Sequence, residues 1–235
     1  MTTMIAKAAF AATQISKARG FSPFRRSHLS EVLAGLLGYR TLAAFQAEES
    51  DASADYHLDD AEHLVLNLPL AMARATRLAL EDSIVPLCIE ALKSVVTANV
   101  FEGVDDFYDS FAREQLEDGI ASADDTATAM AECNANFYET PELSIETPAT
   151  QDLWTSRDEW TLEAFGTISG NYDAEGDRMY NGSSLNCGGR LVFQKAGRAG
   201  LVLIDFDGGA AVDDSWRDQD YENEQAYWAD REKSS

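Results

Sequence analysis

The chain has 235 residues, a formal net charge of −23 and a hydrophobic share of 45%. A chain of this length buries a sizeable core, and its eleven Phe and four Trp need an apolar interior, so a chain disordered throughout is not expected. The negative charge repels DNA phosphates and anionic lipid over most of the surface, and it favours basic partners instead.

The charge is divided unevenly along the chain. Residues 1–46 carry +5, residues 47–150 carry −19 and residues 151–235 carry −9. The pattern predicts a small basic head joined to a strongly acidic body. This division of charge limits which partners the protein can bind, but it does not identify a reaction.

Three helices are expected in the basic head, residues 1–48. Gly20 and Gly38 stand where helices end, whereas Ser27 and Thr41 stand where helices begin. The apolar side chains between these signals recur at helical spacing. The expected helices span 3–19, 29–37 and 41–46.

The middle region, residues 49–140, is predicted to be acidic and mainly helical. Pro69 and Pro86 suit first turns of helices, where the missing backbone N–H costs no hydrogen bond. A weakly patterned stretch over 48–60 is expected to be a linker or loop. The elements expected after it are a strand at 63–66 and helices at 70–80, 87–96, 104–116 and 123–133.

The sequence changes character after Pro141. We expect a linker at 141–157, an antiparallel β region at 158–212 and an acidic aromatic tail at 213–235. Strands are predicted at 161–169, 190–195 and 201–206, with a hairpin near Gly197 and Gly200 and a loop over 170–189. Helices followed by strands predict an α+β fold, with a helical head and middle and a small C-terminal antiparallel sheet.

Neither a membrane span nor a disulfide framework is expected. No stretch reaches the roughly 20 apolar residues that a bilayer-spanning helix needs. The cysteines, Cys88, Cys133 and Cys187, are odd in number and far apart, which is typical of free, buried thiols in a reducing compartment. We therefore expect a cytoplasmic protein.

The sharpest local motif is the run from Leu203 to Gly209, an apolar strand followed by Asp205-x-Asp207-Gly. It resembles the nucleophile motif of haloacid dehalogenase-type phosphatases, in which one Asp attacks a phosphoryl group and the other acts as acid/base beside magnesium. That family places its motif near the start of a long domain, whereas only twenty-six residues follow Gly209. The favoured interpretation is a strand ending in a polar turn, and an enzyme using Asp205 and Asp207 is the weaker alternative.

No cofactor and no metal site is predicted. The acidic run 173–177 lacks the glycine and glutamate positions of a calcium loop. The three histidines are not paired with cysteines at metal-ligand spacing, and no glycine-rich loop leads into a helix to hold phosphate.

Basic side chains gather around the turns of the head and are the candidate nucleic-acid contacts: Lys17, Arg19, Arg25, Arg26 and Arg40. Clustered arginines on three helices are typical of helix-turn-helix proteins. The third helix, however, offers almost no side chain able to read a base edge. The favoured alternative is that the head docks on the acidic body of the same chain or of another copy. Docking on another copy would make the protein a homo-oligomer.

Two short motifs lie in the same helices, Ser27-His28-Leu29-Ser30-Glu31 and Gly38-Tyr39-Arg40-Thr41. They resemble a small helical module at the N-terminus of uncharacterised proteins carried on bacterial plasmids and integrative elements. More distantly, they are similar to the helical domain attached to some glyoxalase-related proteins, although Leu42 and Phe45 replace the aromatic residue usual after Gly-Tyr-Arg. The resemblance implies a bacterial accessory gene, often mobile, and it implies no catalytic residues.

The predicted function is therefore non-enzymatic: an acidic accessory protein of a mobile element that binds a basic protein partner. Its sharpest form is an inhibitor that imitates nucleic acid, with carboxylates of the helix at 104–116 in place of phosphates. The candidate partner-binding residues are Asp105, Asp106, Asp109 and Glu114. An acidic surface that only keeps the protein dissolved is the simpler alternative. The competing function is a DNA-associated regulator that contacts nucleic acid through residues 1–46 only.

Overall fold

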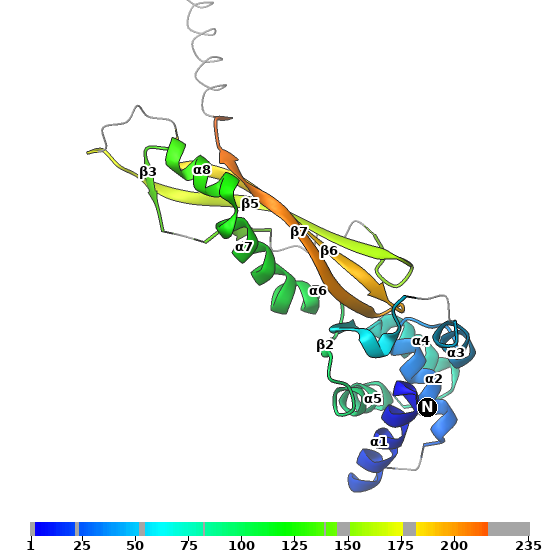
Figure 1. The fold of residues 1–235 in the computed structure, drawn as a ribbon. Coiled ribbons are helices and arrows are strands. Elements are labelled where there is room, and N and C mark those ends of the chain that lie inside the picture. The colour runs from blue at the N-terminus through cyan, green and yellow to red at the C-terminus, as the bar shows by residue number, and fades with distance from the viewer. Residues whose placement is uncertain are drawn as a thin grey trace, which may run out of the picture. The chain divides into compact units, whose positions relative to one another are not determined.

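The computed structural model describes residues 3–21, 24–51, 55–81, 83–138, 140–144, 151–175 and 182–215 (Figure 1). Over these residues the fold is α+β, as predicted, with helices in the first part and long strands in the last third. The chain divides into two compact units. Unit 1 comprises residues 1–112, 149–162 and 191–205, and unit 2 comprises residues 113–148, 163–190 and 206–235.

The first helices of unit 1 share one apolar core. They are α1 (Met4–Ala18), α2 (Arg26–Leu36), α3 (Leu42–Glu49), α4 (Leu68–Arg77) and α5 (Ile84–Lys93), with a short 3₁₀ turn, η1 (Leu58–Asp60). Helix α6 (Val104–Phe107) also belongs to unit 1. Helix α1 packs on α5, and α2 packs on α1, α4 and α5. The apolar stripe of α2, which includes Leu29, Leu33 and Leu36, is fully buried. The three helices of the basic head thus lie in the same core as two helices of the acidic region.

Two ion pairs also join the head to these helices. Glu31, the single acid of residues 1–46, accepts a hydrogen bond from the Arg74 side chain on α4 and another from the backbone N–H of Leu42 (3.1 Å). At the end of α1, Arg19 pairs with Glu90 on α5 at 2.8 Å. The Arg19–Glu90 pair is about half exposed and contributes about 0.2–1 kcal/mol, whereas the Glu31–Arg74 pair is more shielded from solvent, with side chains 24% and 15% exposed. The shared apolar core is the larger stabilising term.

Local capping signals set most helix ends in unit 1. The Thr41 side chain accepts a hydrogen bond from the N–H of Ala44 (3.1 Å), which confirms the predicted cap. Gly38 ends α2 with φ +83°, a left-handed conformation that a residue with a side chain rarely adopts. The predicted cap at Ser27 is wrong, because α2 begins at Arg26. The Arg26 side chain donates to the carbonyl oxygen of Ala6 in α1 (2.9 Å), which is a tertiary contact from the first turn of α2.

The strands form one sheet in the order β2-β1-β7-β6-β5-β3, with β4 beside β5. They are β1 (His63–Val65), β2 (Asn99–Phe101), β3 (Ala135–Phe137), β4 (Glu142–Leu143), β5 (Glu159–Tyr172), β6 (Ser184–Ala196) and β7 (Gly200–Val212). Strands β1 and β2 are parallel, whereas β1 runs antiparallel to β7, and β3 and β4 run antiparallel to β5. A turn containing Gly197 joins β6 to β7, as predicted.

The predicted loop over 170–189 is wrong at both ends, because β5 continues to Tyr172 and β6 begins at Ser184. In β6 the buried positions Leu185, Cys187 and Gly189 alternate with less buried ones. This two-residue period was hidden in the sequence, because Gly and Asn are usual in loops and Cys187 is a weak strand signal.

In unit 2, α7 (Arg113–Ser122) and α8 (Asp124–Glu132) pack on one another and lie along the long strands (Figure 1). Leu116 and Ile120 of α7 are buried, and a Cβ atom on Gly189 of β6 would lie 3.1 and 3.3 Å from their side chains. A Cβ on Gly208 would lie 2.7 Å from the carbonyl oxygen of Gly188, so this strand pair needs glycine there. Strand β7 therefore runs through Gly208 to Val212 instead of ending at Phe206 as predicted.

Two further expectations concern the membrane and the thiols. In the part of the chain that the structure describes, no helix has the length and apolar content to cross a bilayer. The three cysteines are free and buried, as predicted. Burial raises the pKa of the Cys88 thiol to about 12, so this thiol is protonated and unreactive near neutral pH.

Candidate functional site

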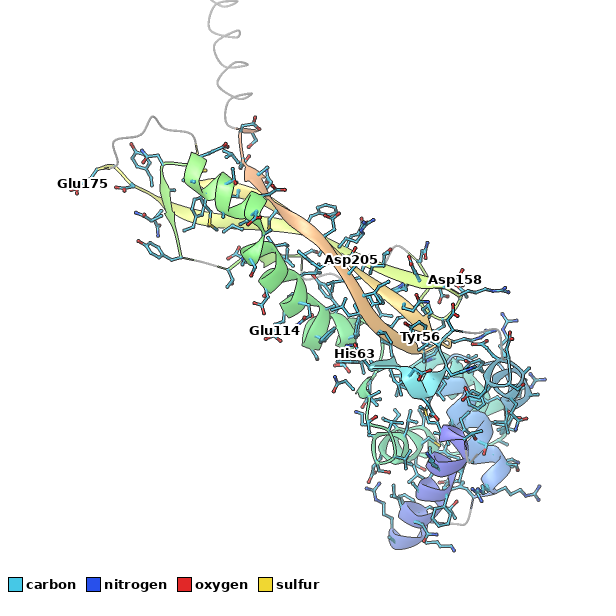
Figure 2. The ribbon with its side chains drawn as sticks, in the orientation of Figure 1. Tyr56, His63, Glu114, Asp158, Glu175 and Asp205 are labelled. Carbon is cyan, nitrogen blue, oxygen red and sulfur yellow. The ribbon has the colours of Figure 1, made fainter. Side chains whose placement is uncertain are left out.

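A cavity of about 660 Å³ opens in unit 1 beside the turn between β6 and β7. Residues from five segments line it: the end of α2, α3, the stretch 55–58, the stretch 154–158 and the β6–β7 hairpin. Figure 2 shows two of the lining residues, Tyr56 and Asp158, near that end of the hairpin. The walls are mostly polar, and the cavity has the size of a small-molecule site.

Tyr39, Glu48 and Arg198 form a connected network in the cavity wall. The Tyr39 hydroxyl donates to Glu48 Oε1 (2.7 Å) and accepts from the backbone N–H of Arg198 (3.3 Å). The Arg198 Nε donates to Glu48 Oε2 (3.3 Å), and its guanidinium lies 5.1 Å from the centre of the Tyr39 ring. Burial, together with the Glu48 carboxylate, raises the pKa of the Tyr39 hydroxyl far above its ordinary value, so Tyr39 stays protonated.

Lys195 is the buried cation of the same wall. Its side chain points to the turn, where Nζ donates to the carbonyl oxygen of Arg198 (2.6 Å), and the residue is only 3% exposed. Burial lowers the pKa of the Lys195 amine to about 7, an effect that Glu48 and Asp152 partly oppose. At neutral pH the amine is therefore close to its midpoint of protonation.

Carboxylates are numerous in the lining of the cavity. They are Glu48, Glu49, Asp51, Asp55 and Asp158. Burial raises the pKa of Glu49, and the neighbouring charge of Asp59 adds to the shift. The five acids outnumber the two arginines of the lining, Arg157 and Arg198.

The sequence did not identify this cavity, although one signal was present. Lys195 follows Leu191 and Phe193 at two-residue spacing, so it lies on the same buried face of β6. A lysine at an inward position of an apolar strand predicts a buried amine. Nothing local, however, indicates that Tyr39 and Glu48 meet Arg198, because 150 or more residues separate them from it.

The predicted nucleic-acid contacts are divided by the structure into two groups. Arg19 and Arg26 are engaged within unit 1, the first with Glu90 and the second with the Ala6 carbonyl oxygen and the Phe10 ring. Lys17, Arg25 and Arg40 are exposed and form no ion pair with any residue that the structure describes.

The predicted partner-binding carboxylates are all exposed. Asp105, Asp106 and Asp109 belong to unit 1, and Glu114 projects from α7 of unit 2 (Figure 2). Asp106 also fixes the start of its helix, because it accepts from the N–H of Glu102 (2.7 Å) and from the Ser110 hydroxyl (3.0 Å). A π-helical turn, η2 (Tyr108–Ala112), continues α6 and allows the adjacent Phe107 and Tyr108 both to be buried.

Burial raises the pKa of Glu117 on α7. The neighbouring Asp118 and Glu114 carboxylates add to this shift, whereas Arg113 opposes it. Like charges on α7 are therefore close enough to repel one another.

Asp205 and Asp207 lie inside β7, where they are exposed (Figure 2 labels Asp205). Asp207 pairs with Arg190 of β6 at 3.7 Å. Among the described residues, no three His, Cys, Asp or Glu side chains come together in a way that could hold a metal ion.

His63 is a buried histidine of unit 1 in an aromatic cluster. Its ring centre lies 4.1 Å from that of Phe111 and 5.9 Å from that of Phe107. Burial lowers the pKa of His63, so the neutral ring that this packing requires is favoured. These ring contacts show that His63 is a residue of the apolar core.

No known protein family, no curated protein and no solved structure matches this chain.

Proposed function

We propose that this protein is a non-enzymatic binding protein whose acidic helices engage a basic protein partner. One observation carries the proposal: the helical run at 104–132 holds nine carboxylates and a single base, Arg113. The carboxylates are Asp105, Asp106, Asp109, Glu114, Glu117, Asp118, Asp124, Asp125 and Glu132. Eight of them are exposed, and Glu117 is half-buried.

The charge density of α7 is of the order needed to imitate nucleic acid. A helix rises about 1.5 Å per residue, so the three acids and Arg113 of this ten-residue helix amount to roughly one net negative charge per 7.5 Å. One strand of duplex DNA carries one charge per about 3.4 Å of axis. The two densities differ by a factor of about two, which supports an inhibitor that competes with nucleic acid for its partner.

The mutual repulsion on α7 also favours a cationic partner. Burial raises the pKa of Glu117, and the carboxylates of Asp118 and Glu114 add to this shift against the opposing charge of Arg113, so the Glu117 charge is held at a cost in free energy. A lysine or arginine of a partner would relieve this repulsion, and binding would then lower the pKa of Glu117. The resemblance of residues 27–41 adds the context of a bacterial mobile element to this proposal.

Neutralising α7 should weaken binding to a basic partner. We expect the variant E114Q/E117Q/D118N to lose about 3- to 100-fold in affinity for purified basic DNA-binding proteins at low salt, since each ion pair contributes about 0.2–1 kcal/mol. Binding is measured by titration at several salt concentrations, with duplex DNA as competitor. The matched control, E159Q/E175Q/D214N, removes three exposed carboxylates elsewhere and should keep its affinity. Equal losses in both variants, or affinity independent of salt, would refute a localised acidic surface.

A second candidate function, DNA association through the head, is favoured by Lys17, Arg25 and Arg40, which are exposed and form no ion pair within the described part of the chain. If it holds, R25Q/R40Q in the full chain should lower the slope of log affinity against log salt by about 2, because each phosphate contact contributes about 0.9. Gel shift with duplex DNA measures this slope. The control R77Q/R157Q has the same net charge and should leave the slope unchanged, and absence of any shift at low salt would rule the function out.

A further inference from the structure

The cavity of unit 1 contains an amine with unused hydrogen-bonding capacity. A protonated lysine has three N–H donors, but Lys195 Nζ makes one hydrogen bond among the described residues, to the carbonyl oxygen of Arg198 (2.6 Å). The side chain is almost completely buried and lines the cavity. A buried ammonium with two unsatisfied donors is costly, whereas a neutral amine satisfies the same carbonyl and keeps a free lone pair.

The protonation state agrees with this geometry. Burial lowers the pKa of Lys195 to about 7, so about half of the molecules hold a neutral amine at neutral pH. An ordinary lysine, with a pKa near 10.4, is neutral in less than about 0.1% of molecules at that pH. The neutral fraction of Lys195 is thus about a thousandfold higher, which is the condition that amine nucleophiles in proteins require.

We propose that Lys195 is the reactive amine of a binding site for small uncharged aldehydes, which condense with it inside this cavity. The Nζ lone pair attacks the carbonyl carbon, a C–N bond forms and the carbonyl electron pair moves to oxygen, which takes up one of the two protons of the amine nitrogen. The resulting carbinolamine loses its hydroxyl, with a proton from nitrogen, as water. The product is an imine, nothing is oxidised or reduced, and the addition of water reverses the step.

The lining favours an uncharged, hydroxylated aldehyde over an anionic carbonyl compound. Five carboxylates, including Glu48, Glu49 and Asp158, face the cavity against two arginines, so the carboxylate of a 2-oxo acid would be repelled. The same carboxylates accept hydrogen bonds from hydroxyl groups. A volume of about 660 Å³ accommodates a molecule of sugar size.

Reductive trapping tests this proposal. The full-length protein is incubated at pH 7 with glyceraldehyde and cyanoborohydride, which converts an imine into a stable secondary amine, and the modified lysines are located by peptide mass mapping. We expect Lys195 to be labelled at least tenfold faster than Lys93, which is exposed and paired with Glu102. The anionic glyoxylate should label Lys195 more slowly than glyceraldehyde does.

Two variants make the result decisive. K195M removes the amine and should abolish the fast labelling, whereas K93M should leave labelling of Lys195 unchanged. Circular dichroism verifies that both variants are folded. Labelling of Lys195 and Lys93 at equal rates, or no modification of Lys195 in the wild-type protein, would overturn the proposal. The α7 variant E114Q/E117Q/D118N should label normally, so the outcome is separate from that of partner binding.

Discussion

Replacing Trp160 by alanine should lower the free energy of unfolding by about 3–5 kcal/mol, the usual cost of deleting a large buried aromatic side chain. Trp160 is fully buried in unit 1, and its ring centre lies 5.8 Å from that of Phe193 and 6.1 Å from that of Phe107. Its Nε1–H donates to the carbonyl oxygen of Gln151 (3.0 Å), so the alanine variant removes this hydrogen bond as well as leaving a void.

Urea unfolding followed by circular dichroism measures this loss. The control is Phe10→Ala in α1 of the same unit, because the Phe10 side chain is 55% exposed and its removal should cost no more than about 1 kcal/mol. Trp160→Phe separates the two contributions, since it keeps most of the packing and removes the indole donor. If the alanine variants at the two positions lost equal stability, Trp160 would not be a core residue.

The sequence predicted most helices of this fold because their signals are local. Thr41 and Gly38 mark helix ends by chemistry that depends on a few neighbouring residues. The start of α2 was misplaced: the helix begins at Arg26 without a side-chain cap, and the Arg26 side chain donates to a carbonyl oxygen of α1. A capping rule contains no information about such tertiary contacts.

The strands show the same division between local and non-local causes. The β6–β7 hairpin follows from an apolar run on each side of a glycine-containing turn. The extensions of β5 and β6 into the Gly- and Asn-rich segment depend on packing partners. Gly189, for example, is a strand residue because Leu116 and Ile120 of α7 fill the space that a side chain would occupy.

The cavity was the least predictable feature, although its residues are ordinary. Lys195 could be expected to be buried from its spacing to Phe193, but the meeting of Tyr39 and Glu48 with Arg198 is set by tertiary structure. The candidate residues taken from charge alone are exposed or hold helices together, as Arg19 and Asp106 do. Runs of charged residues can be recognised in a sequence, whereas a buried amine and its cavity can be recognised only in the folded structure.

Replacing Lys195 by methionine should stabilise the protein at and below neutral pH, and the gain should disappear as the pH rises toward 10.5. Lys195 has a pKa of about 7 in the folded state and an ordinary value of 10.5 when unfolded. Between these values the unfolded chain binds more protons, so the stability of the wild-type protein rises with pH. The full penalty applies below pH 7 and corresponds to an upper limit on the order of 4–5 kcal/mol.

The gain measured in K195M should be smaller, at most about 3–4 kcal/mol at pH 6, because methionine loses the hydrogen bond to the Arg198 carbonyl oxygen, which contributes about 1 kcal/mol. Urea unfolding at several pH values between 6 and 9 gives the slope of stability against pH, which should be steeper for the wild-type protein than for K195M. K93M is the control, because Lys93 is exposed and its removal should leave the slope unaltered. Equal slopes in wild type and K195M would mean that Lys195 stays charged in the fold, and its role as a reactive amine would then lose its physical basis.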